Sequence, residues 1–262
     1  MNTPLYQNDN NKAMVEGIVL QPFTFHHEAF GEKFYVTLIE IMRPLDGIHT
    51  VQLSDQLFIL VSERLINLQK DPVGLRMRVR GQIRTFTERK ETDVMHIRNK
   101  ENINKNTQEW LQLGKIRYVL FATEITESNH LMHVYENNQV VLHGFICKQP
   151  SIRQIASGNE VASFMVAVNR AYGKSDYIPC IVFGRNASYA ASIEIGQRVT
   201  VTGRLQSRLF FKRNPNESQD VICMTWELYV SQIEVFEESN NSARKILCLL
   251  SFPYPQRIHI HN

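Results

Sequence analysis

The stretch that decides the fold reads NRAYGKSDYIPCIVFGRNA at residues 169–187 and continues as IGQRVTVTGRLQSRLF at 195–210. Apolar residues alternate with other residues in both segments, a pattern that predicts β-strands. Between the two strands, ASYAASIE at 187–194 predicts one short helix. The second half of the chain is therefore expected to be a β-domain with a helix placed between two of its strands.

The same pattern occurs once more, earlier in the chain. KAMVEGIVL (12–20) and RVRGQIRTF (78–86) are echoed by VVLHGFICK (140–148) and TVTGRLQSRLF (200–210). Gly17 precedes Gly144 by 127 residues, as Arg43 precedes Arg170, and Gly81 precedes Gly203 by 122 residues. Collinear spacings of this kind indicate two copies of one domain.

Each copy contains about five strand segments with one helix candidate between the third and the fourth, at 62–69 in the first copy. That order is typical of the OB-fold, a five-stranded barrel that often binds oligonucleotides. We predict an all-β chain of two tandem OB-fold barrels, each with one short helix. The expected organisation is a flexible N-terminus (1–11), a first domain (12–127), a linker (128–137), a second domain (138–237) and a tail (238–262). The polar stretch at 87–110 is long for a barrel loop, so it is expected to be mobile or functional.

Alternate side chains of a strand point to opposite faces, which allows the second copy to be sorted. In its fourth strand the interior face takes Val199, Val201, Gly203 and Leu205, and the outer face takes Thr200, Thr202, Arg204, Gln206, Arg208 and Phe210. In its third strand the interior face takes Ile178, Cys180 and Val182, and the outer face takes Tyr177, Pro179, Ile181 and Phe183. Trp226 shares its parity with apolar neighbours and is expected in the core.

Outward rings next to cations predict a surface for single-stranded nucleic acid. Stacking of bases on such rings contributes roughly 1–3 kcal/mol each and tolerates any sequence. The ring candidates are Tyr177, Phe183 and Phe210. The phosphate-binding candidates are Arg170, Lys174, Arg185, Arg204, Arg208, Lys212 and Arg213. The alternative is that the rings bury at a subunit interface and the cations only solvate the surface.

The first copy keeps the cationic ladder but differs in its third strand. The ladder, a possible secondary nucleic-acid site, consists of Arg78, Arg80, Arg84 and Phe86. The outward slots of the third strand are expected to be Asp55, Leu57, Ile59 and Val61, which offer no stacking platform. We therefore expect the first copy to bind weakly or to pack against another barrel, and the second copy to supply most of the affinity.

The segments at 169–187 and 195–208 resemble bacterial single-stranded DNA-binding proteins. The tandem-domain form is the most similar, because its two copies carry patterns like HEAFGEKFY (27–35) and GFICKQPSIR (144–153). The resemblance covers residues 12–127 and 138–236. It matches the family's stacking aromatics to Tyr177, Phe183 and Phe210, and Tyr172 lies close to another such position.

The resemblance implies sequence-nonspecific binding of single-stranded DNA in replication, recombination or repair, with no catalysis and no cofactor. It also implies a four-barrel assembly, which this chain would reach as a homodimer. The N-terminus MNTPLYQNDNNKAM has no basic region followed by an apolar stretch, so we expect a cytoplasmic, nucleoid-associated protein. The family's acidic tail with an aromatic tip is missing, because the chain ends ARKILCLLSFPYPQRIHIHN. Recruitment of repair proteins through such a tail is therefore not expected.

Composition and motifs leave other classes without support. The chain is 43% hydrophobic and 21% charged, which is typical of a globular protein, and its net charge of +3 says little about ligands. No apolar run approaches the roughly 20 residues of a membrane span, and no hydrolase, P-loop or zinc-protease motif occurs. The histidine pairs His130/His133 and His259/His261 have no partner ligands at metal-site spacing, and His26/His27 are expected in a loop. Two alternatives remain: a mediator that binds a replication or recombination protein, and an RNA-binding module.

Overall fold

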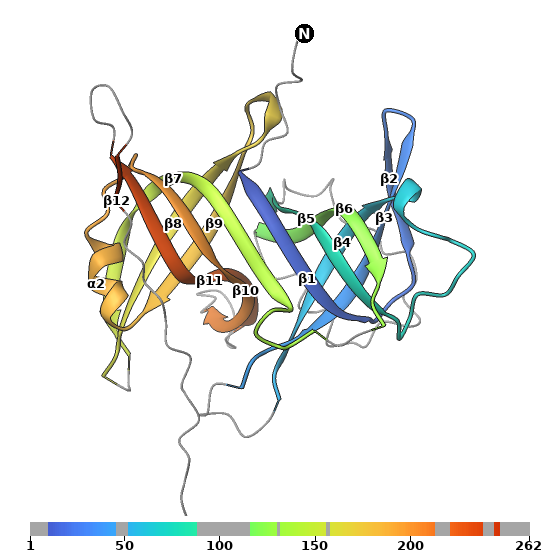
Figure 1. The fold of residues 1–262 in the computed structure, drawn as a ribbon, viewed down its shortest axis with the longest axis horizontal. Coiled ribbons are helices and arrows are strands. Elements are labelled where there is room, and N and C mark those ends of the chain that lie inside the picture. Colours follow the sequence, from blue (N-terminus) through green and yellow to red (C-terminus); the bar gives the residue numbers. More distant parts are fainter. Residues whose placement is uncertain are drawn as a thin grey trace, which may run out of the picture.

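The computed structural model describes residues 10–45, 52–87, 116–129, 132–155, 158–212, 221–237 and 244–246, and most of them form β-strands (Figure 1). The first barrel contains β1 (Asn11–Val19), β2 (Thr24–Ala29), β3 (Glu32–Met42), β4 (Ser54–Ser62), β5 (Arg76–Thr87) and β6 (Ile116–Glu127). The second contains β7 (Asn138–Gln154), β8 (Glu160–Asn169), β9 (Ser175–Phe183), β10 (Arg198–Lys212) and β11 (Val221–Glu237). A short strand β12 (Arg244–Ile246) pairs with β11.

Each set of strands closes on itself. In the first barrel β1 pairs with both β5 and β3, and β4 runs parallel to β6; β2 extends the sheet as a hairpin with β3. In the second barrel β7 pairs with both β8 and β10, and β9 runs parallel to β11. The prediction of an all-β chain with two five-stranded OB-fold barrels is therefore confirmed.

The helical segments at the two predicted positions differ in length. The second barrel has helix α2 (Arg185–Ala191), and a one-turn 3₁₀ segment, η2 (Ala171–Gly173), precedes β9. The first barrel has only the 3₁₀ turn η1 (Glu63–Leu65) in the stretch expected to be helical at 62–69. The side chain of Asn67 accepts a hydrogen bond from the Gln69 backbone N–H at 3.0 Å, and such local bonds favour turns over helices.

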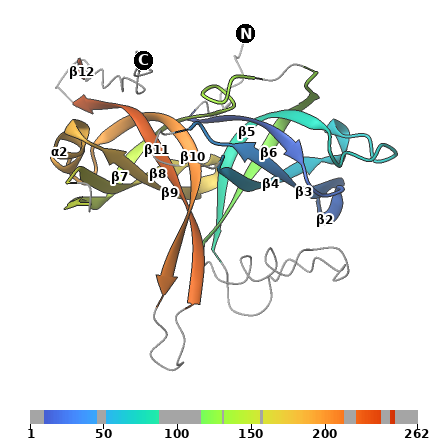
Figure 2. The same cartoon turned by 90° about the horizontal axis from the view of Figure 1, so that it is seen from below.

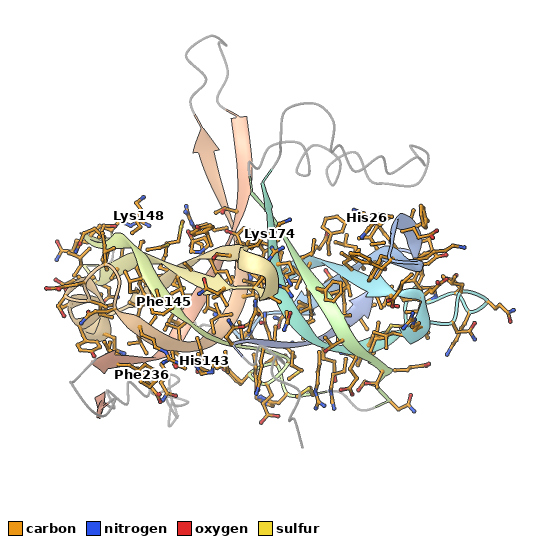
Figure 3. All side chains as sticks on the ribbon, turned by 90° about the horizontal axis from the view of Figure 1, so that it is seen from above. His26, His143, Phe145, Lys148, Lys174 and Phe236 are labelled. Carbon is orange, nitrogen blue, oxygen red and sulfur yellow. The ribbon has the colours of Figure 1, made fainter. Side chains whose placement is uncertain are left out.

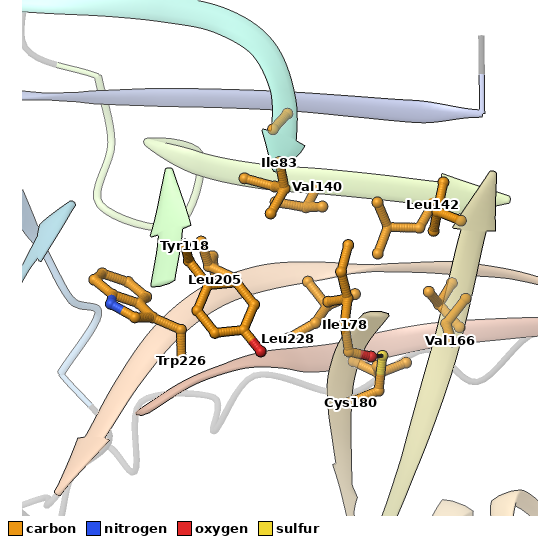
Figure 4. Packing of buried hydrophobic residues seen from close by; sticks show 14 of the residues in the cluster. Ile83, Tyr118, Val140, Leu142, Val166, Ile178, Cys180, Leu205, Trp226 and Leu228 are labelled. Carbon is orange, nitrogen blue, oxygen red and sulfur yellow. Dashed lines mark hydrogen bonds between the residues drawn. The ribbon is translucent and has the colours of Figure 1, made fainter. Parts of the chain in front are cut away.

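The barrel interiors join into one apolar core. Tyr118 of β6 lies close to Leu205 and Trp226 of the second barrel, and Ile83 of β5 lies beside Val140 of β7 (Figure 4). Trp226 is only 6% exposed, so its expected place in the core is confirmed. Burial of apolar surface between the barrels stabilises them as a pair.

The third strand of the first barrel faces the opposite way from the prediction. Asp55 is 2% exposed and Leu57, Ile59 and Val61 are fully buried, so these residues point inward rather than outward. A buried carboxylate needs a partner, and Arg43 provides it through two hydrogen bonds, one of 2.7 Å from Nε. This partner lies twelve residues away in the sequence, on the far side of a loop.

The two barrels are joined by pairing between their first strands, β1 and β7. Residues 11–15 of β1 pair antiparallel with residues 138–142 of β7 (Figure 1). Asn11 forms two hydrogen bonds with the backbone of Ile83, of 2.7 and 2.9 Å. Asn138 forms the matching pair with Leu205, of 2.7 and 3.0 Å. The two halves are therefore related by an approximate two-fold axis that passes between β1 and β7.

Reciprocal clamps hold the barrels on either side of this axis. In one clamp, Arg43 donates to the carbonyl of Ser207 at 2.7 Å, and Asp55 accepts from the Ser207 N–H at 2.8 Å. In the other, Arg170 donates to the carbonyl of Thr85 at 2.9 Å, and Asp176 accepts from the Thr85 N–H at 2.6 Å. Each barrel thus uses an Arg–Asp pair to grip the backbone of the other barrel's fourth strand.

The segment between the barrels is fastened to the first one. Glu16 on β1 is 1% exposed; its carboxylate accepts from the Met132 N–H at 2.9 Å and pairs with Arg78 at 2.8 Å. Burial acts to raise the pKa of Glu16, but the hydrogen bonds from Met132, Arg78 and Ser128 outweigh it, so that the pKa lies below its usual value. The connection therefore lies against the outer face of β1.

Candidate nucleic-acid interface

Two rings and a guanidinium form a row on the outer wall of the second barrel. Phe183 at the end of β9 stacks on Tyr229 of β11, with ring centroids 4.8 Å apart and planes 16° apart. Arg204 of β10 lies directly across from Tyr229, and its guanidinium carbon is 5.0 Å from the Tyr229 ring centroid. Because three neighbouring strands contribute one flat group each, the row offers surfaces on which bases can stack.

Tyr229 was not predicted as a site residue. It occupies the strand face opposite to Trp226 and Leu228, and the same alternation that places those two side chains in the core places Tyr229 outside. The signal was therefore present in the sequence. What the sequence does not contain is the parallel pairing of β9 with β11, which brings Tyr229 beside Phe183.

The third strand of the second barrel presents one strongly exposed ring. Tyr177 is 48% exposed, whereas Ile181, which was expected to face outward, is only 6% exposed. Ile181 is flanked by Ser163 of β8 and by Tyr229 of β11, while Tyr177 precedes the segment that pairs with β11 and is flanked by β8 alone. A residue between two paired strands loses more solvent contact, which accounts for the difference.

Cations accompany these rings. Arg208, toward the C-terminal end of β10, pairs with Glu227 of β11 at 2.8 Å, with side-chain exposures of 46% and 17%. The Arg208 side chain is half-exposed, so its guanidinium can be reached by a phosphate. Lys174 is exposed in the turn before β9, and Figure 3 shows it over the middle of the molecule, where the barrels meet.

Several expected site residues lie beyond what is described. The structure includes the backbones but not the side-chain positions of Tyr172, Arg185, Phe210, Lys212 and Phe86. Arg213 lies outside the described residues altogether, as do the polar stretch at 88–115 and most of the tail. In Figure 2 the β10–β11 hairpin extends well beyond the barrel.

The cationic ladder of the first barrel is engaged within the molecule. Arg78 pairs with buried Glu16, and Arg80 is 3.4 Å from the carboxylate of Glu124, where both partners are exposed. Arg84 is 3.4 Å from the carboxylate of Asp176 in the other barrel. Arg170, expected on the open face of the second barrel, likewise lies where the barrels meet, paired with Asp176.

The first barrel carries a ring cluster on other strands than expected. Phe121 of β6 lies 5.9 Å from Phe34 of β3, and Phe34 stacks on His27 of β2 at 4.9 Å and 12°. Arg84 has its guanidinium carbon 6.0 Å from the Phe121 centroid. The sequence-based prediction considered only the third strand of the first barrel and therefore did not include this cluster, whose members come from β2, β3 and β6.

His26 and His27 belong to strand β2, not to the loop that was expected. A β-bulge shifts the register between Phe25 and His27, and the two Nδ1 atoms are 2.6 Å apart. Burial lowers the pKa of both imidazoles, and the neighbouring charge of His27 lowers that of His26 further. His26 stands at the outer end of this barrel in Figure 3.

The described part of the chain has no candidate membrane-spanning helix and no candidate metal-binding cluster. No helix there is both long and apolar enough to cross a membrane. Among those same residues, no group of three or more His, Cys, Asp or Glu side chains is placed to hold a metal ion.

Comparison with known proteins gives the class. Residues 137–236 match the model of the single-strand binding protein family. A single-stranded DNA-binding protein of Clostridium perfringens is 34% identical over 112 residues, which are 41% of this chain and 71% of that protein. One from Staphylococcus aureus is 41% identical over 78 residues, 27% of this chain and 47% of that protein. This chain belongs to the single-strand binding protein family.

The structure also resembles a solved one across both barrels. The crystal structure of the single-stranded DNA-binding protein from Thermus aquaticus aligns with a TM-score of 0.62 at 14% identity. The alignment covers 89% of this chain and 96% of the other. At this identity the likeness establishes the fold, which includes the first barrel that the family model leaves unmatched.

Proposed function

We propose that this chain binds single-stranded DNA without sequence preference, by base stacking and phosphate contacts, and carries out no bond chemistry. The observation that carries the proposal is the row of Phe183, Tyr229 and Arg204, with exposed Tyr177 on the same strand as Phe183. Every base has a π-face, so such a row accepts any sequence. The names of the related proteins point to the same ligand.

The biological setting that fits this ligand is replication, recombination or repair, where single strands are exposed in the cytoplasm at the nucleoid. The second barrel supplies most of the affinity, because it combines the stacked row with Arg208 and Lys174. The phosphate-binding set includes Arg185, Lys212 and Arg213, and the stacking set includes Tyr172 and Phe210. Arg78, Arg80, Arg84 and Phe86 form the proposed secondary surface. The domain bounds remain those given by the sequence: 12–127 and 138–237, with a linker at 128–137.

A homodimer with four barrels is the proposed assembly. On the outer face of the second barrel, Arg198 lies across from Phe145 on one side and Phe236 on the other, with its guanidinium 5.5 Å from the Phe236 centroid (Figure 3). Phe145 is 40% exposed, and a second copy would cover it. Sedimentation equilibrium of the full chain should give twice its 30.4 kDa mass, and a purely monomeric chain would refute the dimer.

The function is tested by titrating the full chain with labelled oligo-dT, a duplex and an RNA of equal length at two salt concentrations. We expect tight binding of oligo-dT, weak binding of the duplex, and an affinity that falls with salt along a slope of about −0.7 per phosphate contacted. Equal affinity for RNA would extend the ligand class to RNA. Failure to bind any of the three would overturn the proposal in favour of a protein-binding mediator.

A further inference from the structure

The clamp between β5 and β9 contains a cation that the other clamp lacks. Asp176 is fully buried and pairs with two guanidinium groups, Arg170 from its own barrel and Arg84 from the other. At the pseudo-symmetric clamp Asp55 pairs with Arg43, and the position that corresponds to Arg84 is taken by Gln206. Gln206 is neutral, so the two junctions between the barrels differ by one positive charge.

The donors and acceptors at the two junctions also differ. Arg84 and Arg170 carry N–H groups only, and their side chains are 22% and 18% exposed. At the other junction the side chain of Gln206 carries no charge, and its Oε1 atom is buried without a hydrogen-bond partner. An anion therefore suits the first junction and does not suit the second.

The charged junction also lies next to one ring of each barrel. The Arg84 guanidinium is near the Phe121 ring of the first barrel, and Asp176 is followed directly by exposed Tyr177 of the second. Exposed Lys174 belongs to the same turn, where its carbonyl accepts from the Arg170 N–H at 2.6 Å. Burial and the nearby charge of Arg170 lower the pKa of Arg84, while the charge of Asp176 opposes this shift. One carboxylate is thus shared by two guanidinium groups at low dielectric.

We propose that Arg84 and Arg170, which both pair with Asp176, form a phosphodiester-binding site at which one single strand passes from the first barrel to the second. The inference rests on the proposed function, because it concerns the path of the same ligand. A strand whose bases contact Phe121 in the first barrel and Tyr177 in the second has to place its backbone between these rings. Asp176 accepts from Nε and Nη2 of Arg170, and Gln82 accepts from Arg84, so the junction offers a phosphate its excess positive charge, which makes it the crossing point.

The first test is Arg84→Gln, which gives this junction the residue found at the other one. Losing one phosphate contact should lower the affinity for a long oligo-dT about five-fold at 0.1 M salt and reduce the salt slope by about 0.7. Lys70→Gln is the matched control, since it removes one exposed cation that pairs only with Glu127 in the described structure. Equal effects of the two variants would contradict the site, because they would show only the loss of net charge.

The second test separates a phosphate contact from a loosened junction. Asp176→Asn removes the competing carboxylate and keeps both guanidinium groups, so it should strengthen binding of oligo-dT while it lowers the stability of the protein. If Arg84→Gln acted only by loosening the barrels, both variants would weaken binding, and the proposal would fail. If the wild type and Arg84→Gln bind oligo-dT equally well, the junction site is refuted but the proposed function is not. Wild-type protein that does not bind would refute the function itself.

Discussion

The two barrels share their scaffold and differ in their surfaces. The residues that recur at fixed spacing, such as Asn11 with Asn138 and Arg43 with Arg170, bind backbone within a barrel or between barrels. The ring clusters recur only in part. Phe121 occupies the position of Tyr229, because Gln82 lies across from Phe121 as Arg204 lies across from Tyr229. The ring beside it differs: Phe183 of β9 in the second barrel, and Phe34 of β3 with His27 of β2 in the first. In this chain, repetition therefore marks the residues that build the pair of barrels, and divergence marks the partners of the one shared ring position on the surfaces proposed to contact the ligand.

The largest expected effect comes from breaking the clamps. Asp55→Ala leaves Arg43 without its carboxylate and should lower the free energy of unfolding by about 3 kcal/mol, at the lower end for a broken buried ion pair. Asp176→Ala leaves two guanidinium groups facing each other and should cost more than Asp55→Ala. Chemical denaturation of the full chain measures both changes.

Glu124→Ala is the control for the clamps, because its pair with Arg80 is exposed on both sides. Exposed pairs contribute about 0–1 kcal/mol, so this variant should unfold almost as the wild type does. If all three variants lost the same stability, the clamps would be ordinary surface contacts and the comparison between scaffold and surface would not hold.

The sequence predicted the fold class because period-two alternation and the repeat are local signals. Alternation placed Val199, Val201 and Leu205 correctly inside the second barrel. It failed at Asp55, since a carboxylate reads as an outward residue until its buried partner Arg43 is known. Asp176, the equivalent residue in the second barrel, lies on the same strand face as Ile178 and is likewise buried. Aligning Asp55 with Asp176 would therefore have placed Asp55 on the inward face.

The candidate site was predictable only in part, for a related reason. Tyr177 and Phe183 follow from strand parity together with the family resemblance. The stack on Tyr229 and the pairing of Arg170 with Asp176 depend on which strands become neighbours, and parallel pairing and contacts between barrels leave no mark in local sequence. The roles of Arg84 and Arg170 at a shared junction could therefore not be read from either repeat alone.

The two barrels should also differ, by a smaller effect, in how their stability depends on pH. Burial lowers the pKa of His26 and His27 in the folded protein, so the unfolded chain takes up protons first as the pH falls. The stability associated with these residues is complete above the ordinary histidine pKa of 6.5 and is lost progressively below it. The protection factors of backbone amides, which correct for the slower intrinsic exchange at lower pH, should therefore fall in β2 and β3 between pH 6.5 and 5, and fall less in β8 and β9.

The double variant His26→Gln/His27→Gln should remove this pH dependence, because glutamine does not titrate in the range. An equal fall of the protection factors in both barrels of the wild type would show that other groups control the acid response. The bulge that brings the two imidazoles together would then have no part in the difference between the barrels.

The most direct measurement compares two ring variants for affinity to oligo-dT by fluorescence anisotropy, with thermal unfolding to confirm that each variant is folded. Phe183→Ala, in the second barrel, should weaken binding by roughly 1–3 kcal/mol, the range for one base stacked on one ring. Phe121→Ala, in the first barrel, should weaken it less. Unchanged affinity of Phe183→Ala, or a larger loss for Phe121→Ala, would contradict the claim that the stacked row of the second barrel is the principal surface for single-stranded DNA.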